Sequence, residues 1–235
     1  MSPDRRAEIA ANLAAVEDRI TAACRSSGRD RSEITLIAVT KTFPAEDVGH
    51  LAALGVREVG ENRAADAVAK VAACAEAGVE GLVWHFVGQV QTNKAAAVAS
   101  CCDVVHSVDR ARLVVALDRA AGAAGRRLRA LVQVDLAGAD GRGGAAPADV
   151  PALAEAVAGA EHLDLAGVMA VAPLGEDPAA AFRRLAAVAA DLRRDHPAAT
   201  VVSAGMSGDL EAAVAAGATH LRVGTALLGS RPPLG

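Results

Sequence analysis

Lys41 is the residue of this chain best suited to covalent chemistry, because only three of its 24 basic residues are lysines. It lies in the stretch LIAVTKTFP (residues 36–44), after four apolar residues typical of a buried strand. Arginine is used almost everywhere else that a positive charge is needed. A lysine at a strand end therefore indicates a function that a guanidinium lacks, which is to lose its proton and attack a carbonyl. The alternative is an ordinary surface lysine just past a strand.

Two glycine-containing loops in the last part of the chain could bind an anion. SAGMSGD (203–209) includes Ser203 and leads into a helical pattern, and RVGTALLG (222–229) has Gly224 and Thr225 at the start of another. Glycine permits close backbone approach, and N–H groups at a helix start can point at a phosphate together with a hydroxyl. Each loop taken alone also fits an ordinary helix cap.

The elements that must position these residues alternate between strands and helices. Apolar residues at helical spacing predict an amphipathic helix over the first two dozen residues, ending before residues 26–28. Eight strand-like runs follow, each succeeded by a helical pattern: ITLIAV, REVGE, GLVWHFVG, CDVVHSV, LRALVQVDL, LDLAGVMAV, ATVVSAG and THLRVG. This rhythm predicts one α/β domain over 1–235, a single (β/α)8 TIM barrel with an extra N-terminal helix. A doubly wound open sheet is the alternative.

Composition narrows the classes of partner. A hydrophobic fraction of 52% with only 2% aromatics predicts a core of Ala, Val and Leu. The net charge of −4 comes without a basic stripe, so we expect no nucleic acid partner, and no apolar stretch is long enough to predict a membrane span. Four cysteines without CxxC spacing fit reduced thiols in a cytoplasmic protein, and the six histidines lack metal-ligand spacing. We expect a cytoplasmic monomer without a metal.

Barrel closure would bring the lysine and the two loops together. Functional groups of such barrels lie on the loops after the strands, and strand eight closes against strand one. Partial desolvation at this mouth would favour the neutral, nucleophilic amine of Lys41. A ligand with both an aldehyde and a phosphate would fit, and pyridoxal 5′-phosphate (PLP) is such a ligand. Arg222 would point toward the same mouth, where a cation facing the ring nitrogen would disfavour protonation of the pyridine.

Seven motifs carry a resemblance to a known family: AVTKTFP, VGEN (59–62), WHFVGQVQTNK (84–94), HSVD (106–109), GVMAV (167–171), GMSGDLEAAVAAGAT (205–219) and RVGTALLG (222–229). In this order they closely resemble the YggS/PROSC family of PLP homeostasis proteins over nearly the whole chain. The resemblance implies a barrel similar to the N-terminal domain of alanine racemase, with PLP held as an aldimine on Lys41. It also implies that Asn62 lines the pocket, that Ser203, Gly224 and Thr225 hold the phosphate, and that Arg222 approaches the ring or the phosphate.

Two departures from the family pattern stand out. Arg63 follows the GEN motif where many relatives carry tyrosine, and the loop GADGRGG (138–144) differs from the usual one. Neither involves the lysine or the predicted phosphate loops.

Two functions of different classes fit these features. The first is a carrier without turnover, which holds PLP on Lys41 and releases it to PLP-dependent apoenzymes as transient partners. The second is an enzyme, either an amino acid racemase or a Schiff-base aldolase. A racemase of the alanine type needs a tyrosine base, and this chain has no tyrosine. An aldolase needs an acid/base pair, and the candidates Glu61, Asp109 and Asp135 form no obvious pair. We therefore expect no catalytic residues.

Overall fold

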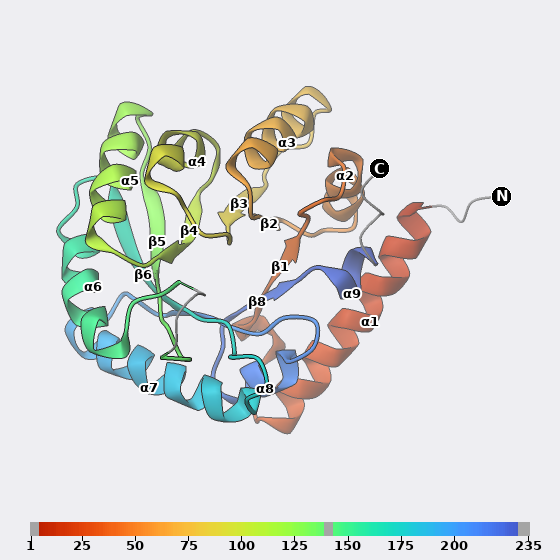
Figure 1. Cartoon of the computed structure of the whole chain (residues 1–235). Coiled ribbons are helices and arrows are strands. Elements are labelled where there is room, and N and C mark those ends of the chain that lie inside the picture. The colour runs from red at the N-terminus through yellow and green to blue at the C-terminus, as the bar shows by residue number, and fades with distance from the viewer. Residues whose placement is uncertain (1–4, 139–142, 230–235) are drawn as a thin grey trace.

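Eight parallel strands close into a barrel in the computed structural model, which describes residues 5–138 and 143–229 (Figure 1). The strands are β1 (Thr35–Val39), β2 (Glu58–Glu61), β3 (Val83–Phe86), β4 (Val104–Val108), β5 (Leu128–Gln133), β6 (Leu163–Met169), β7 (Val201–Ser203) and β8 (His220–Val223). They pair in sequence order, and β8 closes the ring with Ile37 of β1 beside Arg222. The predicted (β/α)8 barrel is confirmed, and the doubly wound alternative is wrong.

Helices surround the strands on the outside of the barrel (Figure 1). They are α1 (Arg5–Ser26), α2 (Ala45–Ala53), α3 (Ala64–Glu76), α4 (Ala95–Cys101), α5 (Ala111–Ala123), α6 (Val150–Ala158), α7 (Pro178–Asp195), α8 (Leu210–Ala215) and α9 (Thr225–Leu228), with 3₁₀ turns at Arg31–Glu33, Thr92–Lys94 and Pro147–Asp149. None of the helices within these residues is long and apolar enough to span a bilayer. Most of the predicted loop at 138–144, residues 139–142, lies outside the described residues.

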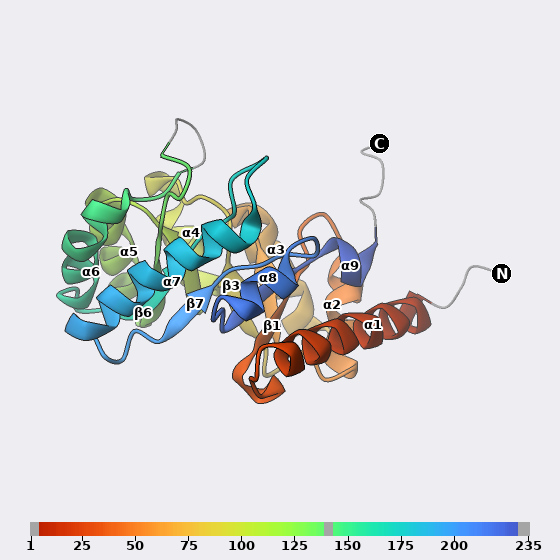
Figure 2. The same cartoon turned by 90° about the horizontal axis from the view of Figure 1, so that it is seen from below.

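The extra N-terminal helix compensates for the short last helix. After β8 the chain forms only the single turn α9, and α1 packs against α2, α8 and α9 with Ile9, Val16 and Ile20 buried (Figure 2). Arg5 joins these elements, donating to the Asp47 carboxylate on α2 at 2.7 Å and to the α9 end at 2.9 Å. The predicted helix is confirmed, although it ends at residue 26 rather than before it.

The main core lies between the strands and the outer helices and consists mostly of Ala, Val and Leu, as the composition predicts. The barrel interior differs, because a separate and smaller apolar cluster fills one part of it: Leu131, Ala166, Met169 and Val201. Polar side chains occupy another part. His106 on β4 bonds Ser203 on β7 at 3.0 Å, and since these strands are not neighbours the contact crosses the interior.

Candidate binding site

A cavity of about 520 Å³ opens at the carboxyl ends of the strands. Its lining comes from the ends of β1, β2, β3, β6, β7 and β8: Val39, Lys41, Phe43, Asn62, Val87, Gly88, Val171, Met206, Ser207, Gly208, Arg222, Gly224, Thr225 and Gly229. The volume lies within the range of cofactor sites, roughly 300–1,000 Å³. Five of the six predicted site residues therefore meet at one cavity, although they come from segments up to 184 residues apart (225 − 41).

Lys41 lies in a tight turn that directly follows β1. The Phe43 N–H donates to the Thr40 carbonyl at 3.0 Å and closes this turn. Thr42, between them, has a φ of 70°, the only positive φ outside glycine among the described residues. A β-branched residue rarely adopts this conformation, and such strain persists only where the surrounding structure imposes it. The turn thus gives Lys41 a defined place at the cavity edge.

A buried ion pair behind this turn fixes the residues that precede Lys41 and Asn62. Lys70 of α3 donates to the Thr40 carbonyl at 2.8 Å and to the Glu61 carboxylate, which also accepts from the Thr40 hydroxyl at 2.6 Å. All three side chains are buried. This cluster is not among the residues predicted from the sequence, although the rarity of lysine that singles out Lys41 applies equally to Lys70.

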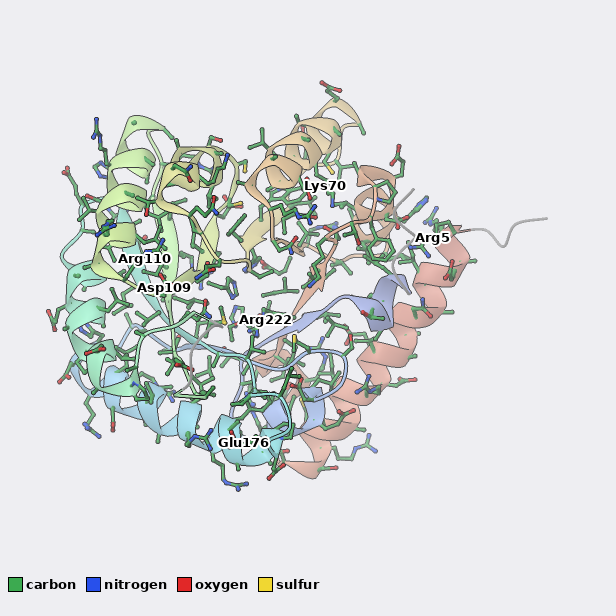
Figure 3. All side chains as sticks on the ribbon, in the orientation of Figure 1. Arg5, Lys70, Asp109, Arg110, Glu176 and Arg222 are labelled. Atoms are coloured by element: carbon green, nitrogen blue, oxygen red, sulfur yellow. The ribbon has the colours of Figure 1, made fainter. Side chains whose placement is uncertain are left out.

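Arg222 places a buried cation at the cavity wall. Its guanidinium donates to the Ser203 hydroxyl at 2.6 Å and to the Ala170 carbonyl at 2.9 Å, so contacts from β7 and β6 hold it (Figure 3). Burial lowers the pKa of Arg222 to about 10, which still leaves it charged at neutral pH. Held in this way, the side chain can meet an anion or a ring nitrogen with little reorganisation.

The two predicted anion loops converge, but with a different serine at the cavity. Ser207 lines the cavity and accepts from the Ala226 N–H of α9 at 3.2 Å, which ties the loops together. Gly224 lies close against the end of β1, because a Cβ there would be 3.1 Å from the Val39 carbonyl oxygen. Ser203 is fully buried beneath, bonded to Arg222, and does not line the cavity. Its predicted phosphate contact stays a prediction, with Ser207 as the better placed hydroxyl.

Asn62 reaches the cavity because the loops after β2 and β3 pack with almost no space between them. A Cβ on Gly88 would lie 2.2 Å from the Asn62 carbonyl oxygen, a distance that no side chain tolerates. The Ser107 hydroxyl holds the Gly88 carbonyl at 2.5 Å from the next strand. Arg63, which departs from the family pattern, is exposed at the start of α3 and does not line the cavity.

The three carboxylates considered for an aldolase point elsewhere. Glu61 bonds Lys70, Asp109 bonds Arg110, and Asp135 accepts from the Ala137 N–H at 2.8 Å. Figure 3 shows Asp109 and Arg110 beside each other, apart from Arg222. None of the three carboxylates belongs to the described lining of the cavity. The site thus combines an amine, a guanidinium, an amide, hydroxyls and glycine loops without a lining carboxylate.

Known proteins resemble this chain over nearly its whole length. A family model for the N-terminal domain of alanine racemase matches residues 11–232. The PLP homeostasis protein of Mycobacterium tuberculosis is 47% identical over 245 residues, covering 97% of this chain and 95% of the relative. That of Escherichia coli K12 is 39% identical over 95% of this chain and 97% of its own length.

A solved structure extends the similarity to three dimensions. PipY of Synechococcus elongatus, determined with PLP bound, superimposes with a TM-score of 0.82 at 37% identity, over 94% of this chain and 100% of the PipY chain. The matched family model, the full-length relatives and the shared barrel together show that the chain belongs to the pyridoxal phosphate homeostasis protein family, whose barrel is that of the alanine racemase N-terminal domain.

Proposed function

We propose that this chain binds PLP at the mouth of its barrel and serves in PLP homeostasis as a carrier. The observation that carries the proposal is the single cavity that Lys41, Arg222 and the Ser207–Gly208 and Gly224–Thr225 loops line together. A primary amine suits an aldehyde, and a cation with hydroxyl-bearing glycine loops suits a phosphate. The donor set therefore fits the cofactor that is bound in PipY.

In this proposal Lys41 supplies the covalent link. Its neutral amine attacks the aldehyde carbon, the C=N bond of an imine forms, and the aldehyde oxygen leaves as water. The reaction is reversible without another reactant, which suits a protein that must release what it binds. PLP supplies electron-sink chemistry wherever it is bound. The residues of this chain would supply attachment and orientation.

The phosphate would lie between the loops after β7 and β8. Gly224 and Thr225 offer backbone and hydroxyl donors there, with Ser203 or Ser207 as the second hydroxyl. Asn62 and Arg222 would contact the ring side or the phosphate from opposite walls. Ser207 keeps its own proton for a ligand, since it acts as an acceptor toward Ala226.

A carrier fits the site better than an enzyme. The chain has no tyrosine to act as a second base, and the carboxylates considered for acid/base roles bond other residues. Positioned acids and bases typically contribute about 10²–10⁴-fold each to proton transfer. We therefore propose release of PLP to dependent apoenzymes in the cytoplasm, by a monomer, as the function of the site.

Deuterium exchange separates the two classes of function. Protein loaded with PLP is incubated with L-alanine and other amino acids in deuterated water, and exchange at Cα is followed by NMR. A carrier should exchange no faster than free PLP at the same concentration. Rapid exchange that disappears in Lys41→Ala, but not in the exposed control Lys94→Ala, would show instead that the protein is an enzyme.

Delivery is tested by transfer. The loaded protein is mixed with a PLP-dependent apoenzyme, or separated from it by a dialysis membrane, and the recovered enzyme activity is followed in both arrangements. Recovery in either arrangement supports release. Retention of all PLP on this protein would argue against a carrier.

A further inference from the structure

A continuous chain of side-chain hydrogen bonds crosses the barrel interior from one rim to the cavity. It begins at Glu58, at the start of β2, whose carboxylate lies 2.5 Å from Nε2 of His85. Nδ1 of His85 lies 2.8 Å from Nε2 of His106, and Nδ1 of His106 lies 3.0 Å from the Ser203 hydroxyl. The Ser203 hydroxyl accepts from Arg222 at 2.6 Å. Five residues on five strands thus connect the lower rim to the cavity wall.

The two ends of this chain determine the direction of every bond within it. A guanidinium can only donate and an ionised carboxylate can only accept. With neutral imidazoles, Ser203 then donates its proton to Nδ1 of His106, and Nε2–H of His106 donates to Nδ1 of His85. Nε2–H of His85 completes the chain by donating to Glu58. Each of the four bonds then has one donor and one acceptor, and both histidines are Nε2–H tautomers.

The opposite direction requires an additional buried charge. If His106 donated to Ser203, it would accept from His85, and His85 would then need protons on both nitrogens to keep its bond to Glu58. A second cation inside the barrel that already holds Arg222 is costly, since His85 is only 1% exposed and His106 is fully buried. Burial, with His85 and Arg222 nearby, keeps the pKa of His106 well below its usual range. The neutral arrangement is therefore the favoured one.

We propose that His85, His106 and Ser203 are positioning residues, a polarised chain that fixes the guanidinium of Arg222 toward its ligand. This inference rests on the proposed PLP site, because Arg222 matters here as one of the residues lining that cavity. Of the five hydrogen-bonded residues, only Arg222 lines the cavity, so the histidines can act on a ligand only through Arg222. Hydrogen bonds in such a network polarise one another in the low-dielectric interior, and the whole chain is expected to act as a unit.

In this arrangement Ser203 links His106 to Arg222 and does not bind phosphate. The hydroxyl has one proton, and that proton goes to His106 while the oxygen accepts from Arg222. A phosphate oxygen would have to compete with His106 for it. Ser203 should therefore behave like His106 in binding experiments, although only a serine could contact phosphate directly.

The first test needs no cofactor. Histidine ¹⁵N NMR of the full chain at neutral pH should show His85 and His106 as neutral Nε2–H tautomers with ring nitrogens coupled across hydrogen bonds. His50, partly exposed on α2, serves as the control and should show a mixture of tautomers. A cationic His85, or an Nδ1–H tautomer of His106, would overturn the assigned direction of the chain.

The second test measures binding of PLP and of pyridoxal, which lacks the phosphate. Ser203→Ala and His106→Leu should each weaken PLP binding about tenfold or more, as expected when a hydrogen bond to a charged group is lost. The ratio of the affinity for PLP to the affinity for pyridoxal should be the same in the two variants. His106→Gln retains an acceptor and a donor at similar spacing and should restore most of the affinity. Combining Ser203→Ala with His106→Leu should add little, because both break one network.

Outcomes that would overturn the inference are distinct from failure of the proposed function. If Ser203→Ala reduced only PLP binding while His106→Leu left both ligands unaffected, Ser203 would be a phosphate ligand and the chain would have no positioning role. The matched control His220→Leu removes another interior imidazole whose ring centroid lies 6.5 Å from that of His85. Equal weakening in this control would also contradict the inference. If the native protein bound no PLP, the proposed function would fail, and the NMR result would still decide the direction of the chain.

Discussion

Removing Lys70 should destabilise the protein more than removing any exposed lysine. Lys70→Met leaves the carboxylate of Glu61, which is fully buried, without its counter-ion and takes a donor from the Thr40 carbonyl. Breaking a buried ion pair by removing one partner typically costs about 3–5 kcal/mol. Domains commonly have a free energy of unfolding of roughly 5–15 kcal/mol, so the loss would be a large fraction of the total.

Urea denaturation at neutral pH measures this change. With an m-value of about 2–3 kcal/mol/M, the unfolding midpoint of Lys70→Met should fall by roughly 1–2.5 M. Lys94→Met is the matched control, because Lys94 is exposed, and it should stay within about 0.5 kcal/mol of the native protein.

A second variant identifies the cause. Replacing both partners with neutral side chains of similar shape, Lys70→Met with Glu61→Gln, should recover most of the lost stability, since no buried charge is then left unpaired. A loss below about 1 kcal/mol in Lys70→Met, or a double variant as unstable as the single one, would refute the assigned role of the pair.

Three further predictions address the glycine loops, acid stability and the phosphate. Gly88→Ala should lower both thermal stability and PLP affinity, because its Cβ would collide with the Asn62 backbone, whereas Gly208→Ala has open space and should leave the unfolding temperature unchanged. Burial, with His85 nearby, lowers the pKa of His220 to about 4. Below about pH 6.5 the unfolded protein therefore binds more protons than the folded one, and the free energy of unfolding should fall by roughly 2–3 kcal/mol as the pH is lowered to 4. In urea denaturation across this pH range, His220→Asn should show a shallower decrease. Thr225→Ala should weaken PLP by about 1.5–3 kcal/mol but leave pyridoxal binding unchanged, and equal losses for both ligands would place the phosphate elsewhere.

Local patterns were enough to predict the barrel and the side of it that carries the cavity. The alternation of apolar runs with helical patterns predicts which segments become strands. In a closed parallel barrel the carboxyl ends of all strands meet at one rim, and the loops that follow them carry the functional residues. Lys41, Arg222 and Thr225 could be placed at the mouth for this reason, since each follows or ends a strand, whereas Asn62 was placed there only by the resemblance to the family. Their position depends on connectivity more than on detailed packing.

The interior contacts could not be predicted in the same way. His106 and Ser203 are 97 residues apart and meet only because the barrel brings β4 and β7 across from each other. In the sequence, Lys70 likewise looks like an ordinary residue of an outer helix, and only the structure shows its ion pair with Glu61. Strand period tells which face a side chain takes, but not how deep it lies, and this is why Ser203 was expected at the cavity although Ser207 lines it.

The most direct test of the central claim is to find which lysine carries the cofactor. Protein incubated with PLP is reduced with borohydride, which converts an imine into a stable secondary amine, and digested peptides are mapped by mass spectrometry. We expect the modification on Lys41, in the peptide containing AVTK, with Lys70 protected by its buried ion pair. Modification chiefly at Lys70 or Lys94, or none on any lysine of a protein that still binds PLP, would contradict it.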